Sequence, residues 1–251
     1  VFFSRDFDVE SALSFIRARN GSGEGCRYSL FGLMIAAAVR TLEAKPVLNR
    51  FVHRRALYQR ESVAVSFIVK KSMSEAAPET SAKVEFPPGG ALAAMSARIE
   101  QAIDAARGAD RGIEERMIDL LHKIPAGKAV VTRIFKLLDA FNIAPAGMIR
   151  NDPLFTSVYF ANLGSLGLDT PFHHLYEWGT ASLFVVMGRI FEKETRKADG
   201  SLQRRRFVNL KFTVDERIAE GICFARALSV FQRLIARPEA IDEPGTGTEK
   251  D

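Results

Sequence analysis

The sequence predicts a single α/β domain, and two kinds of segment lead to that class. Short stretches in which apolar and polar residues alternate, such as 63–69, are typical of β-strands. Segments whose apolar residues recur every three or four positions, such as 92–103, are typical of amphipathic helices. Both kinds are interleaved along the 251 residues, without an internal repeat or a shift in composition that would mark a domain boundary. We therefore expect one domain over residues 1–238, followed by a polar, disordered tail over 239–251.

Capping residues and helix breakers set the expected helix ends. Asp8 and Ser29 each precede an apolar periodic stretch, where a short polar side chain can accept a hydrogen bond from an N–H of the first turn. Pro46 and Pro238 each follow a helical stretch, and proline lacks the N–H that a helix interior needs. The helices expected from these signals cover, in chain order, 9–20, 30–42, 91–106, a segment that includes 117–121, 130–141 and 222–237.

The expected strands are short and are separated by turn-forming residues. In a highly charged stretch, the pair Asp199-Gly200 predicts the turn of a hairpin. Arg204, Arg205 and Arg206 in that hairpin either end a solvated strand or contact an acidic partner. The expected strands and hairpins cover 2–9, 49–58, 62–71, 82–86, 156–160, 182–188, 192–206 and 207–213.

Composition and charge narrow the class of function. With 47% hydrophobic and 26% charged residues, the chain has the composition of a soluble globular protein. Its net charge of +5 is mild, and without a zinc-finger spacing or an aromatic and basic strand signature we expect no nucleic acid partner. The longest apolar run, 30–39, is shorter than the ~20 residues that a membrane helix needs, so no membrane span is predicted. Two cysteines and four scattered histidines give no metal-ligand spacing and suit a reducing, cytoplasmic location.

Three blocks in the second half share their order and spacing with one family. Residues 156–171 form a strand that runs into Asn162-Leu163-Gly164, residues 181–188 form a second strand, and residues 213–221 form a charged loop that ends in glycine. Together they resemble the catalytic domain of the dihydrolipoyl acyltransferases, in which a strand runs into an S-N-L-G turn and a D-H-R-x-x-D-G loop carries the base. The first half fits the same family, so the resemblance covers residues 1–238. Because it shows neither a lipoyl nor a peripheral-binding domain, the chain looks like the stand-alone acyltransferase subunit of a 2-oxo acid dehydrogenase.

The resemblance implies a fold, an assembly and a cofactor. The fold is the chloramphenicol acetyltransferase-like two-layer sandwich, an α/β architecture with a mixed sheet flanked by helices. The assembly is a homotrimer, and a larger cage and protein partners of a dehydrogenase-type complex are further expectations. In this family the active site lies between subunits, where coenzyme A or acyl-CoA enters one end of a channel and the acyl acceptor enters the other. No cofactor is expected to be bound covalently.

Three positions depart from the family's catalytic pattern. Glu216 stands where the family has its general-base histidine, and Glu220 stands where it has a structural aspartate. Ala161, immediately before Asn162, stands where the family has the serine that binds the oxyanion. Histidine takes and returns a proton near neutrality with a pKa of about 6.5, whereas a solvated glutamate at about 4.3 is a poor base. Because loss of an oxyanion donor typically costs a further factor of about 100 to 1,000 in rate, we expect the acyl-transfer chemistry to be lost or altered.

His173 and His174 keep one catalytic alternative open. The stretch from His173 to Gly179 resembles the H-H-x-x-x-D-G motif of the wider superfamily, with Trp178 in the aspartate position. It lies in the segment that joins the first two blocks rather than in the third block, so we expect two structural histidines in a loop. If either one reached the channel from that loop, it would supply the missing base from a new position.

Three functions follow from these observations. The first is a catalytically degenerate trimer that serves as an assembly or binding module. The second is an active coenzyme A-dependent acyltransferase whose base is Glu216 or one of the two relocated histidines. The third is an acyl-CoA sensor that uses the inherited channel. In all three, Asp215 and Arg217 are expected to form a structural ion pair.

Overall fold

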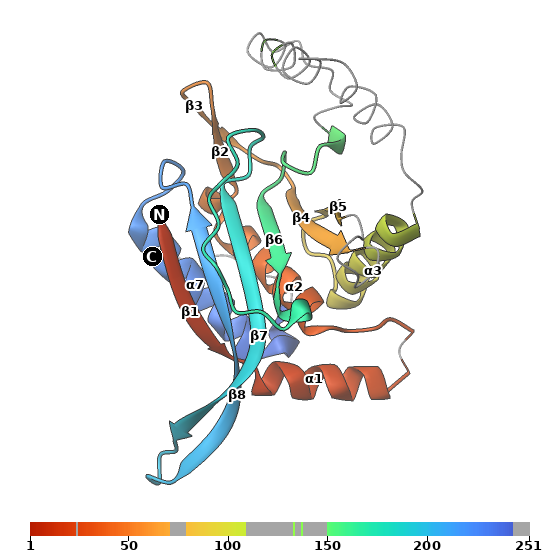
Figure 1. The fold of residues 1–251 in the computed structure, drawn as a ribbon, viewed down its shortest axis with the longest axis vertical. Coiled ribbons are helices and arrows are strands. Elements are labelled where there is room, and N and C mark those ends of the chain that lie inside the picture. The colour runs from red at the N-terminus through yellow and green to blue at the C-terminus, as the bar shows by residue number, and fades with distance from the viewer. Residues whose placement is uncertain (24, 71–78, 109–132, 134–136, 138–149, 243–251) are drawn as a thin grey trace.

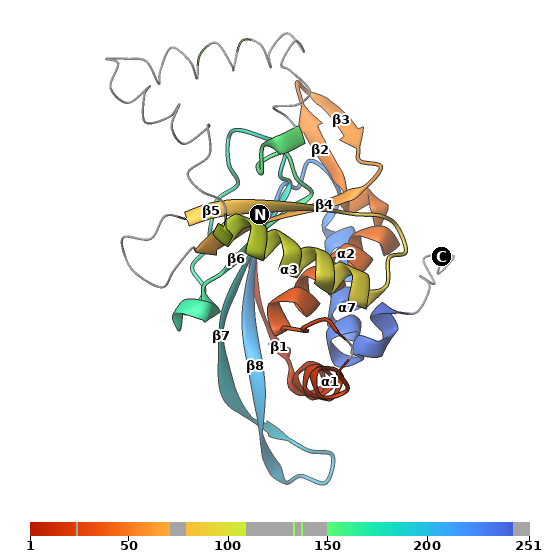
Figure 2. The ribbon, with the colours of Figure 1, turned by 90° about the vertical axis from the view of Figure 1, so that its right-hand side faces the viewer.

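The computed structural model describes residues 1–23, 25–70, 79–108, 133, 137 and 150–242, which fold into two layers (Figures 1 and 2). One layer is a six-stranded sheet in the order β1-β8-β7-β6-β4-β5, and the helices cover one of its faces. The sheet strands are β1 (Phe2–Asp8), β4 (Val63–Lys70), β5 (Glu79–Phe86), β6 (Val158–Asn162), β7 (Leu183–Arg196) and β8 (Leu202–Val214). The helices are α1 (Glu10–Gly21), α2 (Leu30–Ala44), α3 (Leu92–Gly108) and α7 (Gly221–Ala236).

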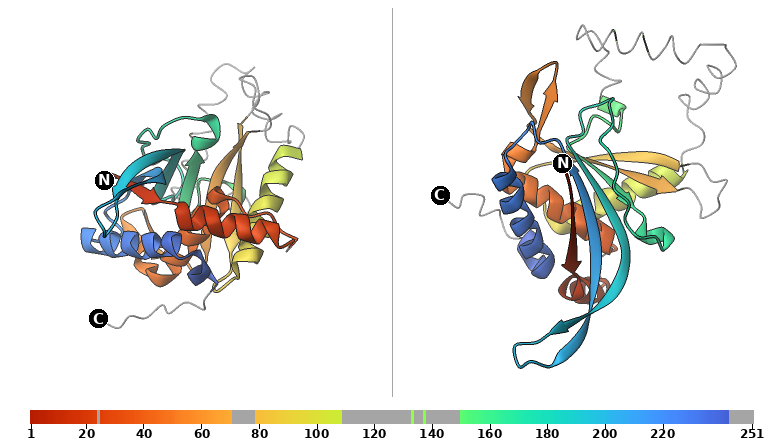
Figure 3. Two further views of the ribbon diagram at one scale, coloured as in Figure 1. Left: turned by 90° about the horizontal axis from the view of Figure 1, so that it is seen from below. Right: turned by 60° about the vertical axis from the view of Figure 1, so that its left-hand side comes forward.

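The sheet is mixed, as predicted for the fold class. β6 runs parallel to both β4 and β7, and the other neighbouring strands are antiparallel. A separate hairpin of β2 (Arg50–His53) and β3 (Ala56–Gln59) projects at one end of the molecule, and the connection between β7 and β8 projects at the other end (Figure 1). Seen from below, the helices form a single layer against the sheet (Figure 3). The predicted mixed sheet flanked by helices is confirmed.

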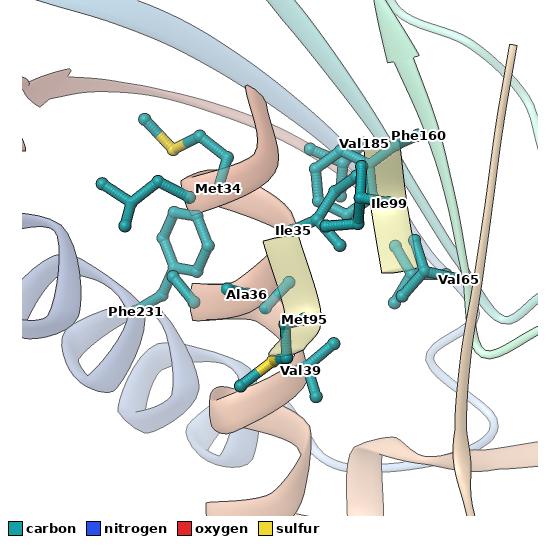
Figure 4. Packing of buried hydrophobic residues seen from close by; sticks show 14 of the residues in the cluster. Met34, Ile35, Ala36, Val39, Val65, Met95, Ile99, Phe160, Val185 and Phe231 are labelled. Atoms are coloured by element: carbon teal, nitrogen blue, oxygen red, sulfur yellow. The ribbon is translucent and has the colours of Figure 1, made fainter. Parts of the chain in front are cut away.

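Helix α2 is the centre of the core. Ser29 Oγ accepts a hydrogen bond from the N–H of Gly32 at 3.0 Å, so the predicted cap is present. Every residue from Gly32 to Leu42 is buried. The stretch is apolar on all sides as far as Val39, as expected of a buried helix, and the buried Arg40 and Thr41 have hydrogen-bond partners. The helix packs between the sheet, α3 and α7, and Figure 4 shows Met95 of α3 and Phe231 of α7 against it.

The two faces of the sheet carry different side chains because successive residues of a strand point to opposite sides. On the helical face, Phe160 of β6 and Val185 of β7 belong to the main core. On the other face, which we call the open face, Tyr159, Ala161, Phe184 and Val186 form a second, smaller cluster. Leu154, Leu163 and Leu175, from the segments around β6 and β7, pack onto this smaller cluster.

The predicted starts of α1 and β5 are wrong. The helix α1 has Val9 rather than Asp8 at its N-cap, although Asp8 Oδ1 does accept the N–H of Glu10 at 3.1 Å. Strand β5 begins at Glu79 rather than at residue 82, because its first residues pair with β4 as far as Lys70. Pairing between strands thus extends β5 into a stretch whose polar composition suggests a loop.

Residues after Pro238 belong in part to the folded body rather than to the expected tail. Pro238–Ile241 form a 3-10 turn, in which Ile241 is completely buried. The carboxylate of Asp242 accepts the N–H of Leu92 at 2.7 Å. Residues 243–251 lie outside the described residues, as do the predicted helix at 117–121 and nearly all of the one at 130–141.

The three consecutive arginines of the β7–β8 hairpin pair with carboxylates of the same chain. Arg204 lies within 4.0 Å of Glu192 and Glu194, Arg205 pairs with Asp8, and Arg206 pairs with Glu10; the shortest contacts are 3.7, 2.8 and 2.7 Å, respectively. Hydrogen bonds from Arg206 hold the pKa of Glu10 at about 2, well below its usual range, against the opposing effect of burial. The hairpin turn at Asp199-Gly200 is confirmed, with Gly200 at a φ of +85°.

Candidate functional site

The charged loop that resembles the family's base loop joins β8 to α7. The N–H of Asp215 donates to the carbonyl of Ser182 at 2.9 Å, so the start of the loop is fixed to the residue before β7. The carboxylate of Asp215 accepts hydrogen bonds from Arg217 Nε at 2.8 Å and Nη2 at 2.6 Å. Burial raises the pKa of Asp215, but the hydrogen bonds and charge of Arg217 outweigh it and lower the pKa. The predicted ion pair between Asp215 and Arg217 is therefore present.

The two glutamates of the loop point to solvent. Glu216 is exposed, and no described residue forms a hydrogen bond or an ion pair with its carboxylate. Glu220 is the N-cap residue of α7, but its side chain makes no capping hydrogen bond. Ile218, between them, is buried and fastens the loop to the body. Nothing in this arrangement desolvates Glu216 or orients it as a base.

Ala161 and Asn162 form the end of β6. Ala161 is buried in the smaller cluster, directly opposite Val186 of β7, and a methyl group there cannot donate a hydrogen bond to an oxyanion. Asn162 closes the turn that follows: its Oδ1 accepts the N–H of Ser165 at 3.3 Å, and its carbonyl accepts the Ser165 hydroxyl at 2.8 Å. Asn162 therefore has a structural partner within its own turn.

The segment that carries His173 and His174 crosses the open face of the sheet. Three outward-facing residues of β8 hold it there. Asn209 and Lys211 contact Thr170, with Lys211 Nζ donating to its carbonyl at 2.6 Å, and the Thr213 hydroxyl donates to the carbonyl of His173. These contacts to the segment that carries His173 were not predicted from the sequence. The signal for them is the alternation of polar residues along β8.

His173 lies over β7, beside the end of β8 that leads into the charged loop. Its ring stacks on Phe184 with 4.0 Å between centroids and 7° between planes. Its Nδ1 lies 2.6 Å from the carbonyl oxygen of His174, which can only accept, so in the neutral ring Nδ1 carries the proton. Nε2 is then left as the hydrogen-bond acceptor of the ring, whereas the side chain of His174 is exposed.

Arg60 is a further residue that sequence reasoning missed. It donates to the carbonyls of Thr156 and Thr180 at 3.0 and 3.2 Å, and so it joins the segments that lead into β6 and β7. Burial lowers the pKa of Arg60 to about 10, and the nearby Glu85 opposes that effect. Because its guanidinium bonds to backbone carbonyls far away in the sequence, no local pattern reveals it.

The six predicted site residues do not form one cluster. Ala161 and His173 are linked only through the smaller cluster, whose member Phe184 stacks on His173, while Glu216 and Glu220 lie on the exposed loop. The contact of His173 with the His174 carbonyl is the one hydrogen bond that joins any two of the six. Within the described ranges, no group of three His, Cys, Asp or Glu residues has the arrangement of a metal site. In the same ranges, no helix has the length and apolar character that crossing a bilayer requires.

The fold is shared with known acyltransferases, although the sequence matches no family model and no curated protein. The cubic core of the pyruvate dehydrogenase multienzyme complex is similar at a TM-score of 0.66 and 16% identity, over 96% of this chain and 83% of that chain. The same values hold for dihydrolipoamide acetyltransferase from Azotobacter vinelandii. Chloramphenicol acetyltransferase is similar at a TM-score of 0.53 and 11% identity, over 94% of this chain and 86% of that chain.

This chain therefore has the chloramphenicol acetyltransferase-like acyltransferase fold. More particularly, the resemblance to the catalytic domain of the dihydrolipoyl acyltransferases is confirmed at the level of the fold. At these identities the likeness defines architecture, and the chemistry must be argued from this chain's own residues.

Proposed function

We propose that this chain is a catalytically degenerate acyltransferase-like protein that serves as a homotrimeric assembly or binding module. One observation carries the proposal: the loop of the missing base presents an exposed Glu216 without a partner among the described residues, and β6 has Ala161 at the position that should supply an oxyanion donor. Acyl transfer to a thiol or hydroxyl needs a base near neutrality and stabilisation of the tetrahedral oxyanion. Both groups are replaced, so the inherited fold is left to bind and to assemble.

The Azotobacter dihydrolipoamide acetyltransferase supports the assignment of these positions. A serine, a histidine and an asparagine four residues after the histidine have roles in the catalytic mechanism of that enzyme. Glu216 and Glu220 have the same spacing in this chain, and Ala161 precedes them on β6. The three replaced positions all correspond to groups that act together in one reaction. Their joint replacement favours loss of acyl transfer over the adjustment of a single catalytic group.

The open face of the sheet is suited to contact between copies of this chain. Phe2 is 54% exposed and Phe172 is 51% exposed, and their rings contact each other at 5.7 Å between centroids. Tyr176, which packs near Phe184, extends the same surface. Contiguous exposed apolar side chains often mark an interaction site, and one of the structural neighbours is the cubic core of a multienzyme complex. We infer a homotrimer, with coenzyme A, partners of a dehydrogenase-type complex and a cytoplasmic location as further parts of the proposal.

Light scattering coupled to gel filtration tests the assembly. We expect a trimer at micromolar concentration, and we expect the double variant Phe2→Ser/Phe172→Ser to elute as a monomer because it removes the apolar centre of the proposed contact. The matched control is Leu57→Ser/Leu202→Ser, which removes two equally exposed apolar side chains from the two hairpins. A wild-type monomer at these concentrations, or equal dissociation in both double variants, would contradict the proposal.

A second candidate function, an active coenzyme A-dependent acyltransferase, is favoured by the tautomer of His173. A proton on Nδ1 leaves Nε2 free to act as a base, and the ring is held rigidly on Phe184. His173 lies beside Thr213, which is two residues before Asp215. An acyl-CoA sensor would share the ligand without the reaction, and calorimetric titration with coenzyme A separates both of these functions from a module without ligand.

Substitution of His173 tests this candidate. Transfer from acetyl-CoA to a thiol acceptor, followed by mass spectrometry, is expected to fall at least ~100-fold in His173→Ala if His173 is the base, because a general base contributes about that much or more. His174→Ala is the matched control. It removes the exposed imidazole next to His173 but keeps the backbone carbonyl of residue 174 that contacts His173 Nδ1. Unchanged turnover in His173→Ala, or no turnover in the wild type, would eliminate the candidate.

A further inference from the structure

The projecting hairpin of β2 and β3 is positively charged. Residues 49–60 contain four arginines and one histidine, but neither Asp nor Glu. At the base of the hairpin, Arg60 is engaged with backbone carbonyls of other segments. Arg50 Nε donates to the neutral side chain of Gln59 at 3.0 Å, a bond that leaves its charge uncompensated. A concentration of one sign of charge on a projecting element attracts an acidic partner.

Two arginines form the turn of this hairpin in a backbone conformation that is unfavourable for them. Arg54 has a φ of +49° and Arg55 a φ of +67°. Two-residue hairpin turns with positive φ at both positions are usually made by Asn-Gly or Asp-Gly, because a Cβ makes the left-handed conformation costly. Both arginine side chains are exposed. The charge at the tip is therefore kept at a conformational cost, as is common at functional sites.

The outer edge of β3 is open to pairing with another strand. The N–H of Arg60 donates to the carbonyl of Asn49 at 3.0 Å, and hydrogen-bonded and non-hydrogen-bonded pairs alternate along an antiparallel ladder. In the register of the hairpin, the backbone N–H and C=O groups of Leu57 and Gln59 therefore point away from β2. Among the described residues the hairpin is a sheet of two strands, so no third strand covers these groups. Such an edge is a template for another chain.

The side chains of the hairpin favour an extended peptide over a nucleic acid. All four residues of β3 are exposed, including Leu57 and Tyr58, and β3 lacks the charges or proline with which proteins usually protect an edge. Single-stranded nucleic acids bind by stacking their bases on aromatic rings. The ring of Phe51 is already stacked on Tyr58 at 5.3 Å between centroids, and it lies under the Arg60 guanidinium at 4.5 Å. An extended peptide would instead use the outward backbone groups and the exposed Leu57.

We propose that the outer edge of β3 is a docking site for an extended acidic segment of a partner protein, which adds to the hairpin as a third strand. The backbone of the segment pairs with Leu57 and Gln59, an apolar side chain lies beside Leu57, and carboxylates face Arg54 and Arg55. Strand addition takes its affinity from main-chain hydrogen bonds and its specificity from such side chains. A two-stranded hairpin is only marginally stable in water, so a third strand also stabilises it. This docking site goes beyond the proposed assembly role and requires neither the trimer nor the altered catalytic positions.

Fluorescence anisotropy with labelled octapeptides and the full chain tests the docking site. The acidic probe is Asp-Glu-Val-Thr-Val-Thr-Glu-Asp. A second probe has two adjacent prolines in place of its central Thr-Val, which removes an N–H of the ladder in either register but keeps every charge. A third probe has lysine in place of each acidic residue. We expect the acidic probe to bind, the other two to bind at least ~5-fold more weakly, and high salt to weaken the acidic probe because exposed charges are screened.

Charge reversal at the tip supplies the first matched variants. Arg54→Glu/Arg55→Glu is expected to weaken binding of the acidic probe at least ~10-fold, because like charges then face each other. The control is Arg196→Glu/Lys197→Glu, which makes the same change in net charge at exposed positions of the β7–β8 hairpin. Equal loss of binding in both double variants would show that only the net charge matters, and it would overturn the site.

Proline on each edge supplies the second pair. Leu57→Pro removes an outward N–H of β3 without removing a hydrogen bond to β2, and it should weaken the acidic probe at least ~5-fold. Val52→Pro makes the same change on the opposite edge of the hairpin and should leave binding unchanged. If either proline variant fails to fold, the charge-reversal pair decides.

Further results would overturn the docking site. They are no binding of the acidic probe, equal binding of the proline probe, and tighter binding of a labelled oligouridylate that is lost in Arg54→Glu/Arg55→Glu, which would make the hairpin a nucleic acid site. A fall in the light-scattering mass of that variant would make the hairpin a contact between copies of this chain instead. A wild-type monomer that binds the acidic probe would remove the assembly role and leave the docking site standing, and a trimer that does not bind it would do the reverse.

Discussion

Replacement of Gly164 by alanine is expected to lower the free energy of unfolding by about 3 kcal/mol, because it forces two backbones apart. A Cβ at residue 164 would lie 2.3 Å from the carbonyl oxygen of Gly188 and 2.7 Å from its carbonyl carbon. Both are backbone atoms of β7, so no side chain can rotate to make room. The N–H of Leu163 also donates to Met187 at 2.9 Å, which holds the turn against that strand.

Chemical denaturation of Gly164→Ala and Gly21→Ala tests the expectation. Gly21 is the last residue of α1, and nothing lies within 4 Å of a Cβ built there. Its replacement by alanine should leave stability unchanged or raise it by about 0.4–1 kcal/mol, by restricting the unfolded chain. If Gly164→Ala were as stable as Gly21→Ala, the close approach of the 3-10 turn Gly164–Leu166 to β7 would not exist as described.

Local patterns were sufficient for the elements whose own residues decide their structure. The apolar run at 30–42 and the cap at Ser29 define α2 without reference to the rest of the chain. The strand β4 is likewise predicted by the alternation of its own residues. The pair Asp215 and Arg217 was also within reach, since both partners lie in one short loop. In each case the residues that determine the local structure lie within or next to the segment that adopts it.

Contacts between distant residues account for what the sequence did not reveal. The family pattern marked Gly164, but its reason is a carbonyl 24 residues away in β7. His173 was expected to be an ordinary loop residue, and only Thr213 and Phe184 determine where its ring lies. A cavity of about 70 Å³ between α7 and the helical face of the sheet depends on how α7 packs on four strands, which no single segment encodes. The candidate site is therefore predictable in position along the chain but not in geometry.

Replacement of Arg40 by methionine is expected to lower the free energy of unfolding by about 3–5 kcal/mol, the cost of breaking a buried ion pair. The Arg40 side chain is 6% exposed, and it bonds Glu43 at 2.7 Å through Nη1. It also donates to the carbonyl of Gly90 at 2.8 Å and to the carbonyl of Ile241 at 2.9 Å. Methionine fills a similar volume but donates no hydrogen bond, so Glu43 Oε2 and the two carbonyls all lose the bond that Arg40 makes to them.

Thermal and chemical denaturation should be compared across Arg40→Met, Arg17→Met and the double variant Arg40→Met/Glu43→Met. Arg17 is exposed on α1, so its replacement should change stability by less than about 0.5 kcal/mol. The double variant also removes the Glu43 carboxylate, which has lost Arg40 and keeps only the N–H of Gly89, at 3.2 Å, as a partner among the described residues. It should recover part of the loss, since a buried ion pair can be replaced by apolar groups at little net cost. Full recovery of the free energy of unfolding would mean that water forms hydrogen bonds with the carbonyls of Gly90 and Ile241 in place of Arg40. No recovery would mean that Arg40 acts chiefly by fastening Pro238–Ile241 to α2, which would make the residues after 238 a structural part of the domain.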